Sequence, residues 1–250
     1  MLHQLERKLL LLAAFLFPLS LPALSQTVST AATSNQTTQS YPVRLYREAT
    51  KTESHLYNGP EYVDYRRASR DGHQYFLQDK SAPGNVRYDG SLYEDVPLLY
   101  DIVTHEVIVV SNGYLLQKLI TEKVTAFEWQ GHRFIRHVAP DSTVRGALPT
   151  GFYDVVYEGG TQLLINRSKL KEDKITDQKV IEVYTSNDRF FIKKDSAYYP
   201  VQRAASVYNI FSDKKKELKK FARTQKFSFK HRREEAIMAL VRQYDLLKNS

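Results

Sequence analysis

Hydrophobic and polar positions alternate with a period of two over much of the chain from residue 41 to residue 202. Tyr, Val, Ile, Phe and Leu occur there in short runs, and Gly, Asn, Asp and Pro separate the runs. Because a period of two places successive side chains on opposite faces of a strand, the pattern predicts β-strands. The predicted strands are 42–47, 61–66, 73–78, 85–88, 106–110, 114–119, 123–129, 132–138, 152–157, 161–166, 179–185, 189–194 and 197–201.

Turn residues between these runs predict that consecutive strands form hairpins. Ser111-Asn112-Gly113, Gln130-Gly131 and Glu158-Gly159-Gly160 stand between runs, and such residues supply the positive φ angles of tight turns. Within 123–129 one set of alternate positions is more apolar than the other, which is typical of a sheet with one buried face. We expect a mainly β fold, built as a curled antiparallel sheet or a partly open, barrel-like meander.

After Pro200 the apolar period changes from two to 3.6, which predicts two C-terminal α-helices packed on the sheet. A shorter helix is expected to start near Ser212 or Asp213, either of which can cap it, and to end near Gln225. A short turn is expected just before it. The last helix carries an apolar stripe formed by Ile237, Leu240, Val241, Tyr244 and Leu247.

The first forty residues have the pattern of a signal peptide followed by a polar linker. Arg7 and Lys8 precede an apolar run and then small residues, which is the order of regions in a cleavable signal peptide. The run of about 13 apolar residues is shorter than the roughly 20 that span a bilayer, so we expect no transmembrane helix after cleavage. The predicted organisation is a signal peptide (1–25), a disordered Ser/Thr/Gln-rich leader (26–40), an antiparallel β body (41–202) and a basic helical segment (203–250).

The composition narrows the chemistry that the chain can perform. There is no Cys, which excludes disulfides, thiol nucleophiles, thiolate zinc sites and a lipidated N-terminus. The sequence contains no GxSxG, HExxH, Walker, GxGxxG or calcium-loop motif. His132 and His137 are five residues apart on one predicted strand and so face opposite sides. The sequence therefore nominates no catalytic residue, no metal site and no cofactor.

The positive charge is concentrated in the helical segment. Residues 201–250 contain thirteen Lys and Arg against five Asp and Glu. Their balance of +8 equals the net charge of the whole chain. Such a surface can contact anionic lipid headgroups, an acidic glycan or an acidic envelope protein, although lysines also serve simply to keep a helix solvated. Nucleic acid is not expected as a partner of an exported protein. The basic residues nominated for binding are Lys215, Lys216, Lys219, Lys220 and Arg223.

The segment 88–101 combines tyrosines, acidic residues and turn formers. Tyr93 and Tyr100 are nominated as further binding residues, because aromatic rings stack on sugars and on apolar ligands. Carboxylates in the same region could act in pairs in glycoside hydrolysis, and acidic residues at turns and strand edges are the simpler interpretation. The acidic residues are Asp89, Glu94, Asp95, Asp101 and Glu106.

The segment 88–101 and the lysine-rich stretch 213–221 together resemble a family of exported proteins from Bacteroidota. In that family a tyrosine-rich β body precedes a lysine-rich helical tail. The resemblance implies an exported β protein, and it carries no established activity and no site residues.

We expect a non-enzymatic exported protein, in the periplasm, on the cell surface or secreted, that binds a partner or organises the envelope. The alternatives are a glycan or ester hydrolase that uses carboxylates or a dispersed Ser-His-Asp triad, and an outer-membrane β-barrel. The barrel ranks last because the chain ends in a charged helix and not in a membrane strand.

Overall fold

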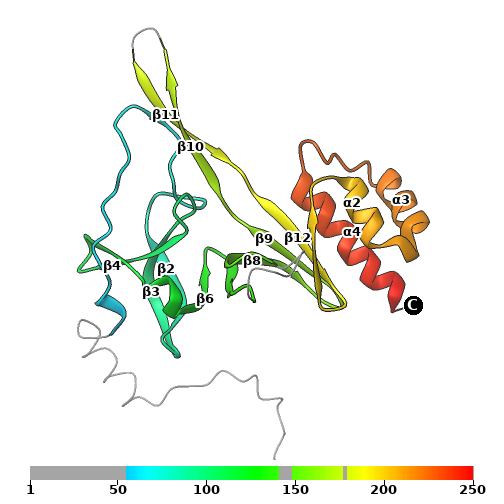
Figure 1. Cartoon of the computed structure of the whole chain (residues 1–250), viewed down its shortest axis with the longest axis horizontal. Coiled ribbons are helices and arrows are strands. Elements are labelled where there is room, and N and C mark those ends of the chain that lie inside the picture. Colours follow the sequence, from blue (N-terminus) through cyan, green and yellow to red (C-terminus); the bar gives the residue numbers. More distant parts are fainter. Residues whose placement is uncertain (1–54, 141–147, 177–178, 250) are drawn as a thin grey trace, which may run out of the picture. The chain divides into compact units, whose positions relative to one another are not determined.

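The computed structural model describes residues 55–140, 148–176 and 179–249 (Figure 1). The predicted signal peptide, the leader and the strand 42–47 lie outside these residues. Within them the fold is mainly β, with antiparallel sheets followed by C-terminal helices, as the sequence predicts. None of the described helices combines the length and the apolar character needed to span a membrane.

The described residues form one large antiparallel sheet of ten strands in the order β13-β12-β9-β8-β7-β6-β2-β3-β4-β5. Its edge strands β13 and β5 do not pair with each other, so the sheet is open. Most neighbours are joined by hairpins, as the turn residues predict. The strands are β2 (Ala82–Tyr88), β3 (Ser91–Asp101), β4 (Glu106–Ser111), β5 (Leu115–Lys118), β6 (Val124–Trp129), β7 (His132–His137), β8 (Gly151–Glu158), β9 (Gln162–Asn166), β12 (Arg189–Lys194) and β13 (Ala197–Val201).

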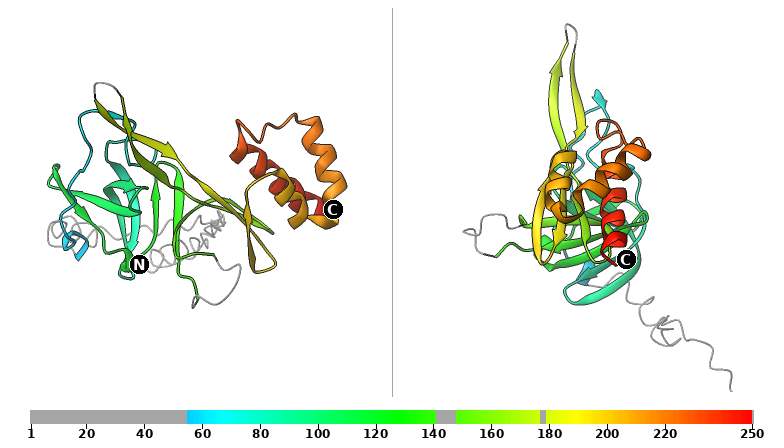
Figure 2. Two further views of the ribbon diagram at one scale, coloured as in Figure 1. Left: turned by 45° about the horizontal axis from the view of Figure 1, so that its top comes forward. Right: turned by 90° about the vertical axis from the view of Figure 1, so that its right-hand side faces the viewer.

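A second, three-stranded sheet has the order β1-β11-β10, with β1 (Arg70–Asp71), β10 (Lys169–Ile175) and β11 (Val180–Ser186). Strand β9 of the large sheet leads into β10, and β11 leads back into β12. The pair β10–β11 is therefore a two-stranded ribbon that extends from the large sheet (Figures 1 and 2). The sequence predicted β11 and missed β10, because five of the seven residues of β10 are charged and show no apolar alternation.

All three predicted turns join consecutive antiparallel strands, and two of them use the expected positive φ angles. Asn112 with Gly113 and Gln130 with Gly131 have positive φ angles in the β4–β5 and β6–β7 hairpins. The prediction is wrong for Gly159 and Gly160, neither of which has a positive φ. Gly159 serves close approach instead: a Cβ there would lie 2.7 Å from the Oδ2 atom of Asp245 in the last helix.

Two predicted strands, 61–66 and 73–78, are irregular segments that contribute isolated bridges at Glu61 and Tyr75. Their aromatic residues are buried one by one in the core, which produces the apolar runs in the sequence. Strand β3 was not predicted, because a β-bulge interrupts its alternation opposite residues 84–86. Within this bulge Asp95 has a φ of 55°.

A further register shift between Arg87 and Tyr88, where β2 pairs with β6, changes which residues of β6 are buried. Strict alternation would put the Val124 side chain on the opposite face of β6 from Phe127 and Trp129, yet all three side chains are buried. The main core lies against this part of the sheet, where the rings of Phe127 and Phe134 stack with centroids 4.6 Å apart.

Three helices pack near the β8, β9, β12 and β13 end of the large sheet (Figure 1). They are α2 (Ala204–Ile210), α3 (Lys215–Thr224) and α4 (Arg233–Lys248). The predicted stripe of α4 is confirmed, since Ile237, Leu240, Val241 and Tyr244 are fully buried. The sequence predicted only a turn where α2 forms.

The expected N-cap of α3 is not present. The cap position is Lys214, and no side chain caps the helix. Asp213 instead accepts hydrogen bonds from the Tyr244 hydroxyl at 3.0 Å and from the Lys194 ammonium at 3.2 Å. Burial opposes ionisation of Asp213, but these two hydrogen bonds outweigh it and lower its pKa. Asp213 thus ties the start of α3 to α4 and β12.

Two polar contacts attach α4 to the sheet. Asp245 is buried and accepts hydrogen bonds from the Tyr157 hydroxyl at 2.9 Å and from the backbone and hydroxyl of Thr161 at 2.9 and 3.0 Å. Near the start of α4, the Glu234 carboxylate accepts from the buried guanidinium of Arg167 at 2.7 and 2.9 Å. These contacts hold α4 against the sheet at both of its ends.

Candidate binding surface

Helix α3 turns one side to the core and the opposite side to solvent. Leu218 is fully buried, and Phe221 and Ala222 pack against the same apolar cluster. At about 100° per residue the nominated basic residues share an arc of roughly 140° whose centre lies about 130° around the helix from Leu218. We call this arc the basic face; it consists of Lys215, Lys216, Lys219, Lys220 and Arg223.

The side chains of the basic face are accessible to solvent, and their charges are not neutralised by described carboxylates. Lys215 is half-buried and the other four residues are exposed. None of them forms an ion pair with a described carboxylate. Lys215 donates to the Asn209 amide oxygen at 3.3 Å, and the Lys219 ammonium lies 5.8 Å from the centre of the Tyr208 ring.

The arrangement of the basic face costs helix stability. Lys215 and Lys219, Lys216 and Lys220, and Lys219 and Arg223 are like-charge pairs four residues apart. Such pairs repel, and three of them together cost about 1 kcal/mol. Lysines in the first turn also oppose the positive end of the helix dipole. A mixture of Lys and Glu would keep the helix equally soluble without this cost.

Further basic residues follow α3 in the connection to α4. Lys226, Lys230 and Arg232 are exposed. Arg232 contacts Glu235 at 3.5 Å, and both side chains are 62% exposed, so solvent screens that pair. The positive region therefore continues beyond α3 toward the start of α4.

Tyr208 is a residue of this surface that the sequence did not nominate. It belongs to α2, is half-buried and lies beside the basic face. Burial raises the pKa of its hydroxyl, and the nearby Arg223 charge partly opposes this rise. Proximity of Tyr208 to Lys219 depends on how α2 and α3 pack, so no local pattern in the sequence indicates it.

The other nominated aromatic residues lie elsewhere. Tyr100 is 1% exposed, its hydroxyl has no hydrogen-bond partner among the described residues, and burial strongly raises its pKa. Tyr93 is half-buried and packs against the main core. Both are on β3, which β2, β6 and β7 separate from the strands that α4 contacts. The structure does not bring these tyrosines to the basic face.

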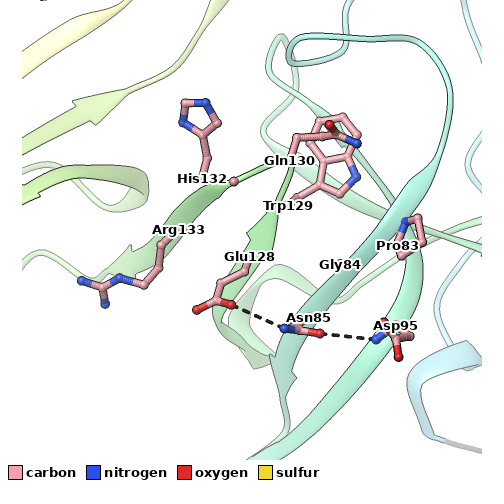
Figure 3. Close-up of a pocket in the computed structure, with 10 residues that line it drawn as sticks. Pro83, Gly84, Asn85, Asp95, Glu128, Trp129, Gln130, His132 and Arg133 are labelled. Carbon is pink, nitrogen blue, oxygen red and sulfur yellow. Dashed lines mark hydrogen bonds between the residues drawn. The ribbon is translucent and has the colours of Figure 1, made fainter.

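A polar cleft of about 400 Å³ lies over β2, β3, β6 and β7 (Figure 3). Three of its residues are linked: the Asn85 amide donates to the Glu128 carboxylate at 3.4 Å, and the Asn85 amide oxygen accepts from the Asp95 backbone N–H at 3.3 Å. Arg133 lines the same cleft and pairs with Glu158. Asp95 and Glu128 thus bring two carboxylates to one groove.

His132 also lines the cleft, but its ring lies on the other face of the sheet from the cleft carboxylate of Glu128. Glu128 pairs across the strands with Arg133, and Trp129 pairs with His132. The His132 ring consequently points away from Glu128 and Asn85 (Figure 3). It contacts the Phe76 ring at 4.9 Å and the buried Asp154 carboxylate at 2.8 Å. No His-assisted reaction at the cleft carboxylates follows from this geometry.

Three other acidic residues of the 88–106 region have structural partners. Asp89 pairs with Lys123 and Glu106 with Lys118, each at 2.9 Å. Asp101 is buried and accepts from the Tyr62 and Tyr65 hydroxyls, both at 2.8 Å.

Metal ligands are also not gathered in the described part of the chain. No group of three or more His, Cys, Asp or Glu side chains there could hold a metal ion. His137 packs against the rings of Tyr153 and Tyr198, on the opposite face of β7 from His132. The expectation that these two histidines face opposite sides is confirmed.

Comparison with known proteins found no matching family model, no similar curated protein and no similar solved structure. The function must therefore be argued from the surfaces described above.

Proposed function

We propose that this chain is an exported, non-enzymatic binding protein whose basic face holds it against an anionic lipid surface. The observation that carries the proposal is the gathering of five basic side chains on the solvent side of α3, with no ion pair to a described carboxylate. Export is supported by the signal-peptide pattern of residues 1–25 and by the resemblance to exported proteins.

The residue types favour a broad charged surface over a small acidic ligand. Four of the five residues are lysines, which act as compact, mobile point charges and lack the bidentate fork with which Arg recognises one carboxylate or phosphate. On the convex side of a helix they diverge and do not converge on one point. An array of lipid headgroups satisfies such an arrangement.

The apolar side of α3 does not take part in binding. Leu218, Phe221 and Ala222 are used in packing against α4 and the sheet, so insertion into the acyl region would require α3 to leave its place. Binding is therefore electrostatic. Each Lys or Arg near an anionic membrane contributes about 1 kcal/mol, and the attraction is screened within about 10 Å at 0.1 M salt.

Vesicle co-sedimentation tests the proposal with a matched pair of variants. Lys216→Glu/Lys220→Glu reverses two charges of the basic face, and Lys80→Glu/Lys179→Glu reverses two exposed lysines on the β body. Losing two contributions weakens partition to anionic vesicles at least about 30-fold. The control variant keeps most of the binding, and vesicles of zwitterionic lipid bind neither chain.

Equal loss in both variants would show that net charge, and not the basic face, governs binding. No binding of the unaltered chain to anionic vesicles at low salt would reject the lipid partner. If the basic face instead binds an acidic glycan or an acidic protein, that binding should be weakened by the Lys216→Glu/Lys220→Glu variant and kept by the Lys80→Glu/Lys179→Glu variant.

The cleft supports a second candidate function, glycoside hydrolysis. Asp95 and Glu128 line one groove, and two carboxylates are the usual catalytic pair of glycosidases. Hydrolysis of a glycan by the unaltered chain, lost in both Asp95→Asn and Glu128→Gln, would favour this candidate. Activity that persists in either variant would reject it.

A further inference from the structure

Strand β10 has a regular, uncovered edge. It pairs with β11 over seven consecutive residues, from Lys169 opposite Ser186 to Ile175 opposite Val180, with no register shift. It contains neither Pro nor Gly. An edge with neither Pro, Gly nor a bulge leaves its backbone groups free to pair with another strand, but charged side chains such as those of β10 oppose pairing unless the incoming strand complements them.

The hydrogen bonds that flank β10 show which of its backbone groups point outward. The Asn187 N–H donates to Ser168 at 2.8 Å, and the Thr176 N–H donates to Lys179 at 2.9 Å, so even-numbered residues bond across to β11. The Lys169 N–H donates away from β11, to Ile102 at 3.2 Å. The three following odd-numbered residues therefore direct their N–H and C=O groups outward; they are Lys171, Asp173 and Ile175.

These outward groups have no hydrogen-bond partner among the described residues, whereas the other sheet edges are protected. Strand β5 is covered by the segment 60–62, since Lys118 donates to Pro60 and Tyr62 donates to Leu116, both at 2.8 Å. Strand β13 contains Pro200 and is followed closely by α2. Strand β1 has only two residues. In the described part of the chain, β10 is the long edge that remains open.

We propose that two copies of this chain associate through β10, paired antiparallel about a two-fold axis with Asp173 opposite Asp173. This register uses the outward groups of Lys171, Asp173 and Ile175 in both copies. It also places Glu172 of each copy opposite Lys174 of the other. The inference is independent of the proposed lipid contact, which lies on α3.

Charge favours this register over its neighbours. Glu172 and Lys174 form no ion pair with other described residues, so both are available to a second copy. Opposite charges that face each other across paired strands stabilise the pairing. The two central Asp173 carboxylates would repel, but each already contacts Arg67 of its own copy at 3.1 Å.

Two neighbouring registers also align outward groups. The one centred on Lys174 opposes two lysines. The other is centred on Glu172. It places two Glu172 side chains against each other, and neither has a cation partner in the described structure. It also needs the Lys169 N–H, which already donates to Ile102. Both features make this register weaker than the one centred on Asp173.

Cysteine cross-linking of the full chain tests the association and its register, because the protein has no Cys of its own. Directly opposed, hydrogen-bonded residues have Cα atoms about 5.5 Å apart, within the range of disulfides. Asp173→Cys should therefore yield a disulfide-linked dimer under mild oxidation. Glu172→Cys is the matched control, since its copies are diagonal neighbours about 7–8 Å apart.

Cross-linking of Asp173→Cys well above that of Glu172→Cys supports the proposal. The reverse order, or equal background levels in both variants, would overturn it.

Sedimentation equilibrium gives an independent readout of the charge pairs. Lys174→Glu turns both Glu172–Lys174 contacts repulsive and should raise the dimer dissociation constant about tenfold. The exchange Glu172→Lys/Lys174→Glu restores opposite charges and should return the constant close to that of the unaltered chain. A monomeric unaltered chain at every concentration, or a double variant no better than the single one, contradicts the proposal.

Discussion

Replacing Arg167 by Met removes the guanidinium that compensates Asp154, a carboxylate buried in the large sheet. Arg167 is 6% exposed and Asp154 is 1% exposed, and two guanidinium nitrogens donate to Asp154 Oδ2 at 2.9 and 2.7 Å. The same guanidinium contacts Asp188 at 2.9 Å and Glu234 at 2.7 Å. These last two side chains are partly exposed and can be hydrated when Arg167 is lost. The main cost therefore arises at Asp154, which keeps only its contact with His132.

Breaking a buried ion pair on one side costs about 3–5 kcal/mol. With a urea m-value of about 2 kcal/mol/M, a loss of about 4 kcal/mol lowers the unfolding midpoint by about 2 M. The single tryptophan, Trp129, is 1% exposed in the main core, so its fluorescence reports unfolding directly. The measurement is a urea titration of Arg167→Met beside the unaltered chain.

A double variant separates charge from packing. Asp154→Asn/Arg167→Met removes the buried charge together with its partner, and we expect it to recover at least about half of the lost stability. A single variant within 1 kcal/mol of the unaltered chain, or a double variant as unstable as the single one, would refute the reasoning.

Three further predictions concern stability. Tyr100→Phe removes a buried hydroxyl without a partner among the described residues, so the free energy of unfolding should stay unchanged or rise by about 1 kcal/mol in urea titrations; a loss above 1 kcal/mol would reveal a missed hydrogen bond. Burial lowers the pKa of His105, and the Asp101 charge partly opposes this shift. As the pH drops below about 6.5, the unfolded chain therefore binds a proton at this histidine before the folded chain does, and the free energy of unfolding falls. His105→Asn should lessen this fall, and an unchanged pH profile would speak against it. Lys216→Glu/Lys220→Glu keeps the pair 216/220 like-charged, but it puts a carboxylate in the first turn of α3 and pairs it with Lys219, and it pairs the second carboxylate with Arg223 three residues on. The melting temperature should therefore stay equal or rise, whereas a clear decrease would assign the lysines a structural role.

The strength of local patterns explains how much of the fold could be predicted. The stripe of α4 has five apolar residues at spacings of three and four, and the helix forms as predicted. Strand β10 carries mostly charged residues because neither face belongs to the apolar core, so its sequence contains no strand signal. Strand β3 was missed because the bulge at Asp95 shifts the alternation.

The basic face could be predicted because its residues are close in sequence and a helix brings them to one side. The network around Arg167 could not, since its partners Asp154, Asp188 and Glu234 are 13, 21 and 67 residues away. The open edge of β10 depends on what the rest of the chain leaves uncovered. Contacts and gaps of this kind arise from tertiary packing and leave no local signal.

The central claim is that the basic face acts through its charge, and one binding measurement tests it most directly. Partition to anionic vesicles is compared for the unaltered chain, Lys216→Arg/Lys220→Arg and Lys216→Glu/Lys220→Glu at one salt concentration. Both chains with positive residues should bind equally, and the chain with glutamates should bind at least about 30-fold more weakly. Equal binding of all three chains would contradict the account.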